Sequence, residues 1–260
     1  MTRGVLRVVG LALLLALASA SAGASRARPP VALTASPAHV ELAGSERATV
    51  RVTNSGTSRV VLDVRRAGFA LDLRGEPKIV GHDAARRSAA AWLGFRPRTL
   101  SLGPGASGSV TVASKVPARA EPGDHDALVL FTTRRRVRDG LAVRVRMGVV
   151  VVVRAPGAVV RRLALRGLRA VRTRRGRLLE LVVVNRGNVT ESLTRGRAVV
   201  SVERGGRRLA RLTAATRSLR PGTRGVLEFP IRRRLRGTVL ARVDLLFGAG
   251  RIQRVYRLRL

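Results

Sequence analysis

The chain has 260 residues, of which 51 are Lys or Arg and 15 are Asp or Glu, and its formal net charge is +36. Apolar residues make up 45% of the chain, which is enough for a core and argues against intrinsic disorder. Cysteine is absent, which excludes disulfides, thiolate metal sites and a cysteine nucleophile, and three scattered histidines exclude a histidine-rich metal centre.

The first segment has the order of a secretory signal peptide. Two arginines precede an apolar run over residues 8–18, and small residues follow as far as Ala24. An uncleaved anchor helix is the alternative, but it needs about 20 apolar residues, and this run is shorter. The sequence therefore predicts a signal peptide over residues 1–24, and a secreted protein whose mature chain has no transmembrane helix.

Positive charge is concentrated in the C-terminal part of the chain, because residues 155–260 hold 27 basic and 5 acidic residues. Only Lys78 and Lys115 are lysines, so nearly all of the charge is arginine. The coding bias of a GC-rich genome is one explanation of this excess. The other is a polyanionic partner such as a cell-wall polymer, anionic lipid or nucleic acid.

After a linker over residues 25–30, short runs of alternating apolar and polar residues predict the strands of a β-sandwich. The run over residues 47–53 is one example, and it ends in an Asn-Ser-Gly turn. The run over residues 141–153 is the longest. Residues 83–91 fit either one helical turn or an irregular loop. We expect a first immunoglobulin-like domain over residues 31–154.

A linker over residues 155–157 precedes a second region of the same style. The expected strands span residues 159–165, 168–172, 178–184, 197–203, 207–213, 225–231, 238–247 and 252–260. Pro-Gly, Gly-Gly and Asn-Arg-Gly-Asn turns separate them. The sequence therefore predicts a second immunoglobulin-like domain over residues 158–260. The fold class is all-β, with two tandem immunoglobulin-like β-sandwiches after a signal peptide.

Several short motifs in both halves carry a resemblance to a known family. In the first half they are Trp92-Leu93, Pro97, Leu102-Gly103-Pro104-Gly105 and Pro122-Gly123-Asp124-His125. In the second half they are Asn185-Arg186-Gly187-Asn188, Leu219-Arg220-Pro221-Gly222 and residues 241–247. The chain resembles the WxL-interacting proteins, which are two-domain surface proteins of Gram-positive bacteria, and the broader set of exported chaperone-like immunoglobulin-fold proteins.

The resemblance implies a first domain that binds peptidoglycan and a second domain that binds a host or partner protein. Members of the family usually end in a membrane helix and a basic tail. This chain stops at a predicted strand, so the resemblance leaves its anchoring to a partner or implies that anchoring has been lost.

Two groups of acidic residues and histidines are candidate metal-binding or catalytic sites. Glu121, Asp124, His125 and Asp126 lie close together in sequence, as do Glu76, His82 and Asp83. The first group could bind calcium, but it lacks a spaced ligand loop, and we expect it to be a solvated hairpin turn. No Gly-x-Ser-x-Gly motif or other nucleophile–base arrangement occurs. We therefore expect no enzymatic activity, no metal site and no cofactor.

Three arginine clusters are the candidate polyanion-binding residues, because guanidinium groups pair bidentately with anionic oxygens. They are Arg134, Arg135 and Arg136; Arg174 and Arg175; and Arg232, Arg233 and Arg234. Solvated turns on a basic surface are the alternative. Trp92 is the candidate glycan contact, or else part of the core. Nucleic acid is not an expected partner, because aromatic platforms and a groove-reading helix are both missing.

The leading hypothesis is a non-enzymatic, cell-wall-associated binding protein that engages anionic wall material or peptidoglycan and another exported protein. The alternative is a chaperone-like protein that stabilises a partner by β-strand addition at an exposed edge. The strand over residues 141–153 is the candidate edge.

Overall fold

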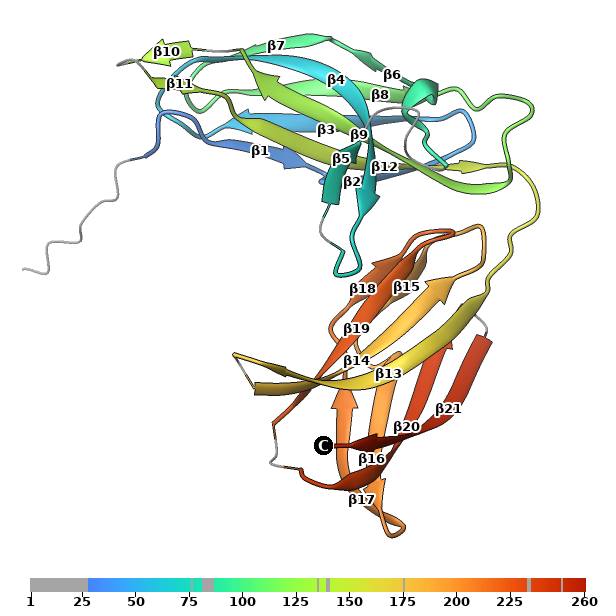
Figure 1. Cartoon of the computed structure of the whole chain (residues 1–260). Coiled ribbons are helices and arrows are strands. Elements are labelled where there is room, and N and C mark those ends of the chain that lie inside the picture. The colour runs from blue at the N-terminus through green and yellow to red at the C-terminus, as the bar shows by residue number, and fades with distance from the viewer. Residues whose placement is uncertain are drawn as a thin grey trace, which may run out of the picture.

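The computed structural model describes residues 28–75, 77–80, 87–134, 136–138, 141–174, 176–232, 235–248 and 250–260. In these residues the chain is all-β, apart from one short 3₁₀ turn at Ala90–Trp92. It forms two tandem immunoglobulin-like β-sandwiches, which Figure 1 shows set at an angle to each other. The predicted signal peptide lies outside the described residues.

The first sandwich contains the strands up to β12. They are β1 (Leu33–Ser36), β2 (His39–Ala43), β3 (Arg47–Asn54), β4 (Val60–Leu71), β5 (Pro77–Val80), β6 (Leu93–Arg96), β7 (Thr99–Leu102), β8 (Ser107–Ser114), β9 (Gly123–Thr133), β10 (Arg136–Arg138), β11 (Leu141–Val143) and β12 (Arg146–Ala155). One sheet has the order β1-β3-β8-β6, and the other has the order β2-β12-β9-β4-β5 with β7 beside β4. The two strands β10 and β11 pair with each other.

Alternation along the strands builds the core between these sheets. In β3, Val50 and Val52 are fully buried, whereas Arg47 and Arg51 are exposed. Successive side chains of a strand point to opposite faces, so a period of two places the valines inside and the arginines in water. The strand predicted over residues 47–53 is confirmed.

The central strand β9 is buried on both faces. One face packs into the first core, where Phe131 and Val129 are fully buried. The other face carries a smaller cluster, here called the outer apolar cluster, made of Ala67, Phe69, Leu128 and Leu130. A strand that is covered on both sides needs a near-continuous apolar sequence, which residues 127–131 supply.

The N-terminal segment crosses from one sheet to the other. Strand β1 pairs antiparallel with β3, whereas β2 pairs parallel with β12 in the opposite sheet. The pairing with β2 covers β12 from Val150 to Arg154. The preceding residues of β12, Arg146 to Val149, therefore have their partner strand β9 on one side and no strand on the other among the described residues.

The second sandwich has its own core. Its strands are β13 (Leu163–Thr173), β14 (Gly176–Asn185), β15 (Glu191–Leu193), β16 (Ala198–Arg204), β17 (Arg207–Thr213), β18 (Arg217–Leu219), β19 (Arg224–Ile231), β20 (Thr238–Phe247) and β21 (Gly250–Arg259). The sheets have the orders β13-β14-β19 and β17-β16-β20-β21, and β15 pairs with β18. The apolar cluster between them shares no residue with the first core.

The structure tests two local predictions, those for residues 141–153 and for residues 83–91. The single strand predicted over residues 141–153 is wrong, because the chain leaves the strand conformation at residues 144 and 145 and forms β11 and β12 instead. Of residues 83–91, which were predicted as a helical turn or a loop, the last two belong to the 3₁₀ turn Ala90–Trp92, and residues 83–86 lie outside the described part. No helix in the described residues is long and apolar enough to cross a membrane.

Candidate functional site

The free edge of β12 is the first candidate site. Strand β9 pairs with β12 from Arg146 to Ala155, whereas β2 begins only opposite Val150. The sequence prediction of an edge strand is thus corrected, because four of the residues that were expected to be free, Val150–Val153, are covered by β2. What stays open is a shorter edge, which we call the β12 edge, at Arg146–Val149.

The direction of the backbone groups on the β12 edge follows from one hydrogen bond. The Val150 N–H points toward β2 and donates to the Ala38 carbonyl oxygen at 3.1 Å. Alternate residues of a strand direct their N–H and C=O groups to the same side. Gly148 and Arg146 therefore present their backbone groups to the open side, while Met147 and Val149 direct theirs toward β9.

The side chains beside the β12 edge are apolar and mostly buried. Met147 packs against the first core, and Val149 is fully buried in it. On the other face of the sheet Gly148 has no side chain, and the buried Leu128 and Leu130 of the outer apolar cluster lie next to it. A Cβ at Gly148 would lie 3.4 Å from Leu130 Cδ2 and 3.5 Å from Leu128 Cδ2. An incoming strand would therefore find both unpaired backbone groups and apolar contacts.

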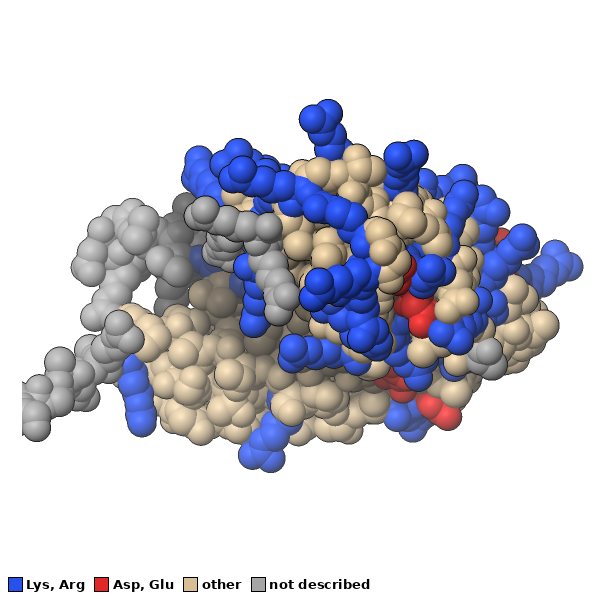
Figure 2. Space-filling model, turned by 90° about the horizontal axis from the view of Figure 1, so that it is seen from below, with Lys and Arg blue, Asp and Glu red and all other residues tan. Residues whose placement is uncertain are grey.

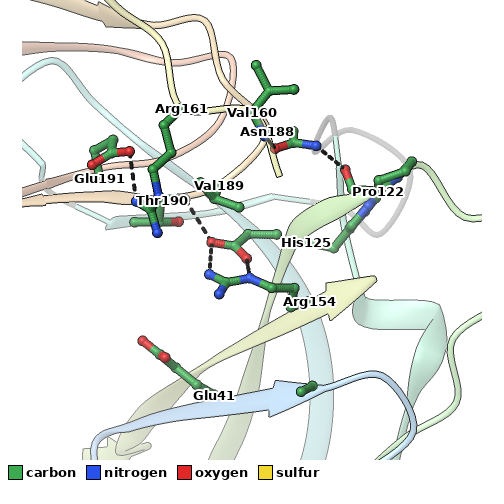
Figure 3. A network of polar contacts seen from close by, with 12 residues as sticks. Glu41, Pro122, His125, Arg154, Val160, Arg161, Asn188, Val189, Thr190 and Glu191 are labelled. Atoms are coloured by element: carbon green, nitrogen blue, oxygen red, sulfur yellow. Dashed lines mark hydrogen bonds and ion pairs between the residues drawn. The ribbon is translucent and has the colours of Figure 1, made fainter. Parts of the chain in front are cut away.

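A seam of polar contacts holds the two sandwiches together at the beginning of β9. The carboxylate of Asp124, fully buried, accepts from Arg154 Nε at 2.7 Å and Nη2 at 3.1 Å. It also accepts from the Thr190 backbone N–H at 2.7 Å. The Asp124 N–H donates to the Asn188 carbonyl oxygen at 2.7 Å. Figure 3 shows Arg154 directed at the Thr190 segment and Asn188 reaching Pro122.

The neighbouring carboxylate on the same face of β9 makes the second contact of the seam. Asp126 is 2% exposed and accepts from Arg220 Nε at 2.6 Å. The Arg220 guanidinium also donates to the Phe69 carbonyl oxygen at 3.2 Å and lies 4.1 Å from the centroid of the Phe69 ring. Burial raises the pKa of Asp126, and the charge of Arg220 opposes part of that rise. Because Arg220 lies in the second sandwich, this pair crosses the seam.

The turn between β4 and β5 makes a third contact. Figure 1 shows this hairpin extending from the first sandwich toward the second. Its Leu73 carbonyl oxygen accepts from the Val226 N–H of β19 at 2.8 Å. Its Arg74 donates from Nη2 to the buried Glu180 carboxylate at 3.0 Å. Arg169 donates to the same carboxylate at 2.9 and 2.6 Å.

Trp92 and His125 lie together on the opposite face of β9 from the seam carboxylates. The two ring centroids are 4.3 Å apart, and Trp92 is half-buried against the first core. His125 Nε2 lies 2.8 Å from the Glu121 carbonyl oxygen. Burial lowers the pKa of His125 below 6.5, because it disfavours the charged imidazolium. A glycan contact at Trp92 stays a prediction.

The expectation of a solvated turn at Glu121–Asp126 is wrong for most of its residues. Asp124, His125 and Asp126 are buried in β9 rather than exposed. The carboxylates are satisfied by Arg154 and Arg220, which lie 30 and 94 residues away in sequence. No group of three or more metal-ligating side chains occurs in the described residues. The second acidic group, which includes His82 and Asp83, lies outside them, with Glu76.

The structure places only part of the predicted arginine clusters. Arg134, at the end of β9, donates from Nε to Asp63 at 3.0 Å. Arg174 and Arg232 are exposed and lie at the same end of the sheet, because Gly176 and Arg177 of β14 pair with Thr173 and Ile231. Arg136 belongs to β10. The remaining members, Arg135, Arg175, Arg233 and Arg234, lie outside the described residues. Polyanion binding by these clusters stays a prediction.

Sequence reasoning missed the role of Gly148 within the candidate edge and the arginines that pair with Asp124 and Asp126. Gly148 interrupts an otherwise Val-rich strand, and an isolated glycine in a strand marks a close approach of another backbone. That signal was available. Arg220 gave no such signal, because its partner Asp126 is a tertiary contact between distant segments.

No protein-family model and no curated protein matches the chain in sequence. The resemblance to WxL-interacting proteins therefore stays a prediction.

Similar folds do occur among solved structures of fimbrial chaperones. A chain from a chaperone–tip adhesin complex of CFA/I fimbriae has a TM-score of 0.49 and 12% identity, over 86% of this chain and 98% of that one. The periplasmic chaperone SfaE has a TM-score of 0.43 and 11% identity, over 88% of this chain and 100% of its own. A chain of the Salmonella enterica complex of SafA pilin with the SafB chaperone has a TM-score of 0.44 and 15% identity, over 88% and 96%.

Proposed function

We propose that this chain is an exported, non-catalytic binding protein that holds an extended segment of another exported protein by β-strand addition at the β12 edge. The observation that carries the proposal is the strand β12 itself, which is paired on both sides from Val150 to Arg154 and on one side from Arg146 to Val149. Such an edge is a ready template for another strand.

The geometry sets what the partner segment must be. Four strand residues extend over about 13 Å, at roughly 3.3 Å a residue. The backbone groups of Arg146 and Gly148 offer two donors and two acceptors to a strand that continues the line of β2. A partner residue opposite Gly148 would have its side chain beside the gap that Gly148 leaves next to Leu128 and Leu130. We therefore expect an extended segment with an apolar residue at that position.

The seam supports this proposal by fixing the surroundings of the edge. The outer apolar cluster faces the second sandwich, because Phe69 contacts Arg220 across the seam. A partner held at the β12 edge would lie beside the same face of the sheet. A scaffold that is already rigid loses less conformational entropy when it binds.

The test is a matched pair of substitutions at Gly148. Gly148→Pro removes an N–H that faces the open side, and proline is tolerated on an edge strand. Gly148→Ala keeps the N–H, and its Cβ would make ordinary contacts with Leu128 and Leu130. Binding of a 12-residue peptide of alternating Val and Thr is measured by calorimetry, with a proline-interrupted peptide as control.

The Gly148→Pro variant should lose binding at least tenfold, because two or more backbone hydrogen bonds at about 0.5–1.5 kcal/mol each depend on the register it breaks. Gly148→Ala should stay within about threefold of the unchanged chain. Thermal unfolding of both variants checks that they fold. Equal binding by Gly148→Pro and the unchanged chain would contradict strand addition at this edge.

A second candidate function, binding of anionic cell-wall polymer, is favoured by one observation. Residues 155–260 carry 27 basic and 5 acidic residues, and Figure 2 shows Lys and Arg over much of the visible face, with few Asp or Glu between them. Co-sedimentation with purified walls should then be lost when the anionic polymers are removed or salt is raised. Retention on stripped walls at high salt would rule this candidate out.

A further inference from the structure

A groove of about 900 Å³ lies on the second sandwich between β17 and β19. Among the described residues each of these two strands pairs with another strand on one side only, since β17 pairs with β16 and β19 pairs with β14. The groove therefore lies between the edge strand of one sheet and the edge strand of the other. It is remote from the β12 edge in sequence and belongs to the other sandwich.

The walls of the groove combine apolar contacts with positive charge. Its apolar residues include Leu209, Ala210, Leu212, Ala214, Pro230 and Ile231. Four arginines line it, Arg195, Arg208, Arg211 and Arg232, and all four are exposed. The one acidic lining residue is Glu228, whose carboxylate lies 3.4 Å from Arg74 Nε. Within the described part of the chain, none of the four arginines forms an ion pair.

The edge of β19 already forms one backbone hydrogen bond with another segment of the chain beside the groove. The Val226 N–H donates to the Leu73 carbonyl oxygen of the β4–β5 turn at 2.8 Å. Because alternate residues direct their backbone groups to the same side, Glu228 and Pro230 direct theirs toward the groove. Proline at this position is typical of an edge, since it has no N–H to leave unpaired.

We propose that this groove binds an extended acidic segment of a partner polypeptide. The backbone of the segment would continue the line begun by Leu73 along the edge of β19. Its apolar side chains would cover Leu209 and Ile231, and its carboxylates would pair with the four arginines. A polymer without apolar side chains would leave the floor of the groove in water, and a second copy of a chain with charge +36 would be repelled.

The experiment measures binding of a capped ten-residue peptide of alternating Glu and Val to the whole chain at 150 mM salt. The comparison ligands are the same peptide with Gln for Glu, and polyphosphate of equal charge. The groove variant is Arg208→Gln with Arg211→Gln. Its matched control is Arg166→Gln with Arg172→Gln. This control removes the same charge from exposed positions of β13, which is the edge strand opposite β19 in the sheet β13-β14-β19.

A steric variant separates the groove from general charge. Ala215 is exposed and lines the groove, so Ala215→Trp fills it without changing charge. We expect about a tenfold loss of Glu-Val peptide affinity for the groove variant and for Ala215→Trp, less than twofold for the control, and much weaker binding of the Gln peptide. Equal losses in the groove variant and its control would overturn the proposal as nonspecific attraction.

Polyphosphate that binds more tightly than the Glu-Val peptide, with the Ala215→Trp variant unaffected, would also overturn the proposal, in favour of an anionic polymer. The result is independent of the β12 edge. Gly148→Pro leaves the groove intact, so the two proposals can fail separately.

Discussion

At the scale of single residues, the seam depends on buried carboxylates paired with arginines. Asp124 and Asp126 are buried at 0% and 2% exposure, and Arg154 and Arg220 supply their hydrogen bonds. Removing one member of such a pair leaves an uncompensated buried charge, which costs more than the pair itself contributes.

The Arg220→Met variant should therefore be destabilised by about 3–5 kcal/mol, because Asp126 stays buried and loses its partner. Chemical denaturation measures the free energy of unfolding. Arg224→Met, at an exposed position of the same region, should change it by less than about 0.5 kcal/mol. The double change Asp126→Leu with Arg220→Met should recover much of the loss. A loss below about 1 kcal/mol for Arg220→Met would contradict a desolvated pair.

His125 should make stability depend on pH. Its pKa is lowered by burial, so the unfolded chain takes up a proton before the folded one does. The contribution of His125 is therefore most favourable above pH 6.5 and falls as the pH drops from 6.5 toward the lowered pKa. We expect the free energy of unfolding to decrease between pH 7 and pH 5, and to decrease less in His125→Gln. Identical slopes in the two proteins would exclude a role for His125.

At the scale of elements, the β4–β5 hairpin links the sandwiches through both backbone and side chain. Leu73 accepts the Val226 hydrogen bond, and Arg74 donates to Glu180. Arg169 donates to the same carboxylate from within the second sandwich. The two arginines thus share one acceptor, but only Arg74 crosses the seam.

This difference gives a paired prediction. Arg74→Ala should loosen the hairpin, so hydrogen exchange of the Val226 amide should become faster. Arg169→Ala should leave the exchange of Val226 unchanged, although each variant should cost about 1 kcal/mol or less because both guanidinium groups are largely exposed. Equal exchange of Val226 in both variants would mean that Arg74 does not hold the hairpin.

The sequence predicted local features better than long-range ones. Alternation in β3 and the turns around Pro-Gly and Gly-Gly pairs are encoded by neighbouring residues, so they could be found without a structure. The covering of Val150–Arg154 by β2 could not, because it depends on a pairing between segments more than 100 residues apart. The sequence predicted a turn at Asp124 and Asp126, because the arginines that pair with them lie in distant segments and gave no local signal. The groove between β17 and β19 requires the same tertiary information.

At the scale of the whole molecule, some of the few acidic residues lie inside, whereas Arg220 is the one buried arginine or lysine in the described part of the chain. Among the described residues four carboxylates are buried, and each is paired with arginine: Asp124, Asp126, Glu180 and Glu191. Most of the remaining arginines lie at the surface, as Figure 2 shows for one face. Asp124, Asp126 and Glu180 therefore contribute to joining the two sandwiches, while most of the arginine excess lies at the surface.

The central claim is that the β12 edge accepts a strand. Amide hydrogen exchange, measured by NMR in the free chain and with the Val-Thr peptide at saturation, tests it most directly. In the free chain Arg146 and Gly148 should exchange rapidly, whereas Met147 and Val149, bonded to β9, should exchange slowly. The peptide should slow Arg146 and Gly148 at least tenfold. Slow exchange of Gly148 in the free chain, or no change on adding the peptide, would contradict the account.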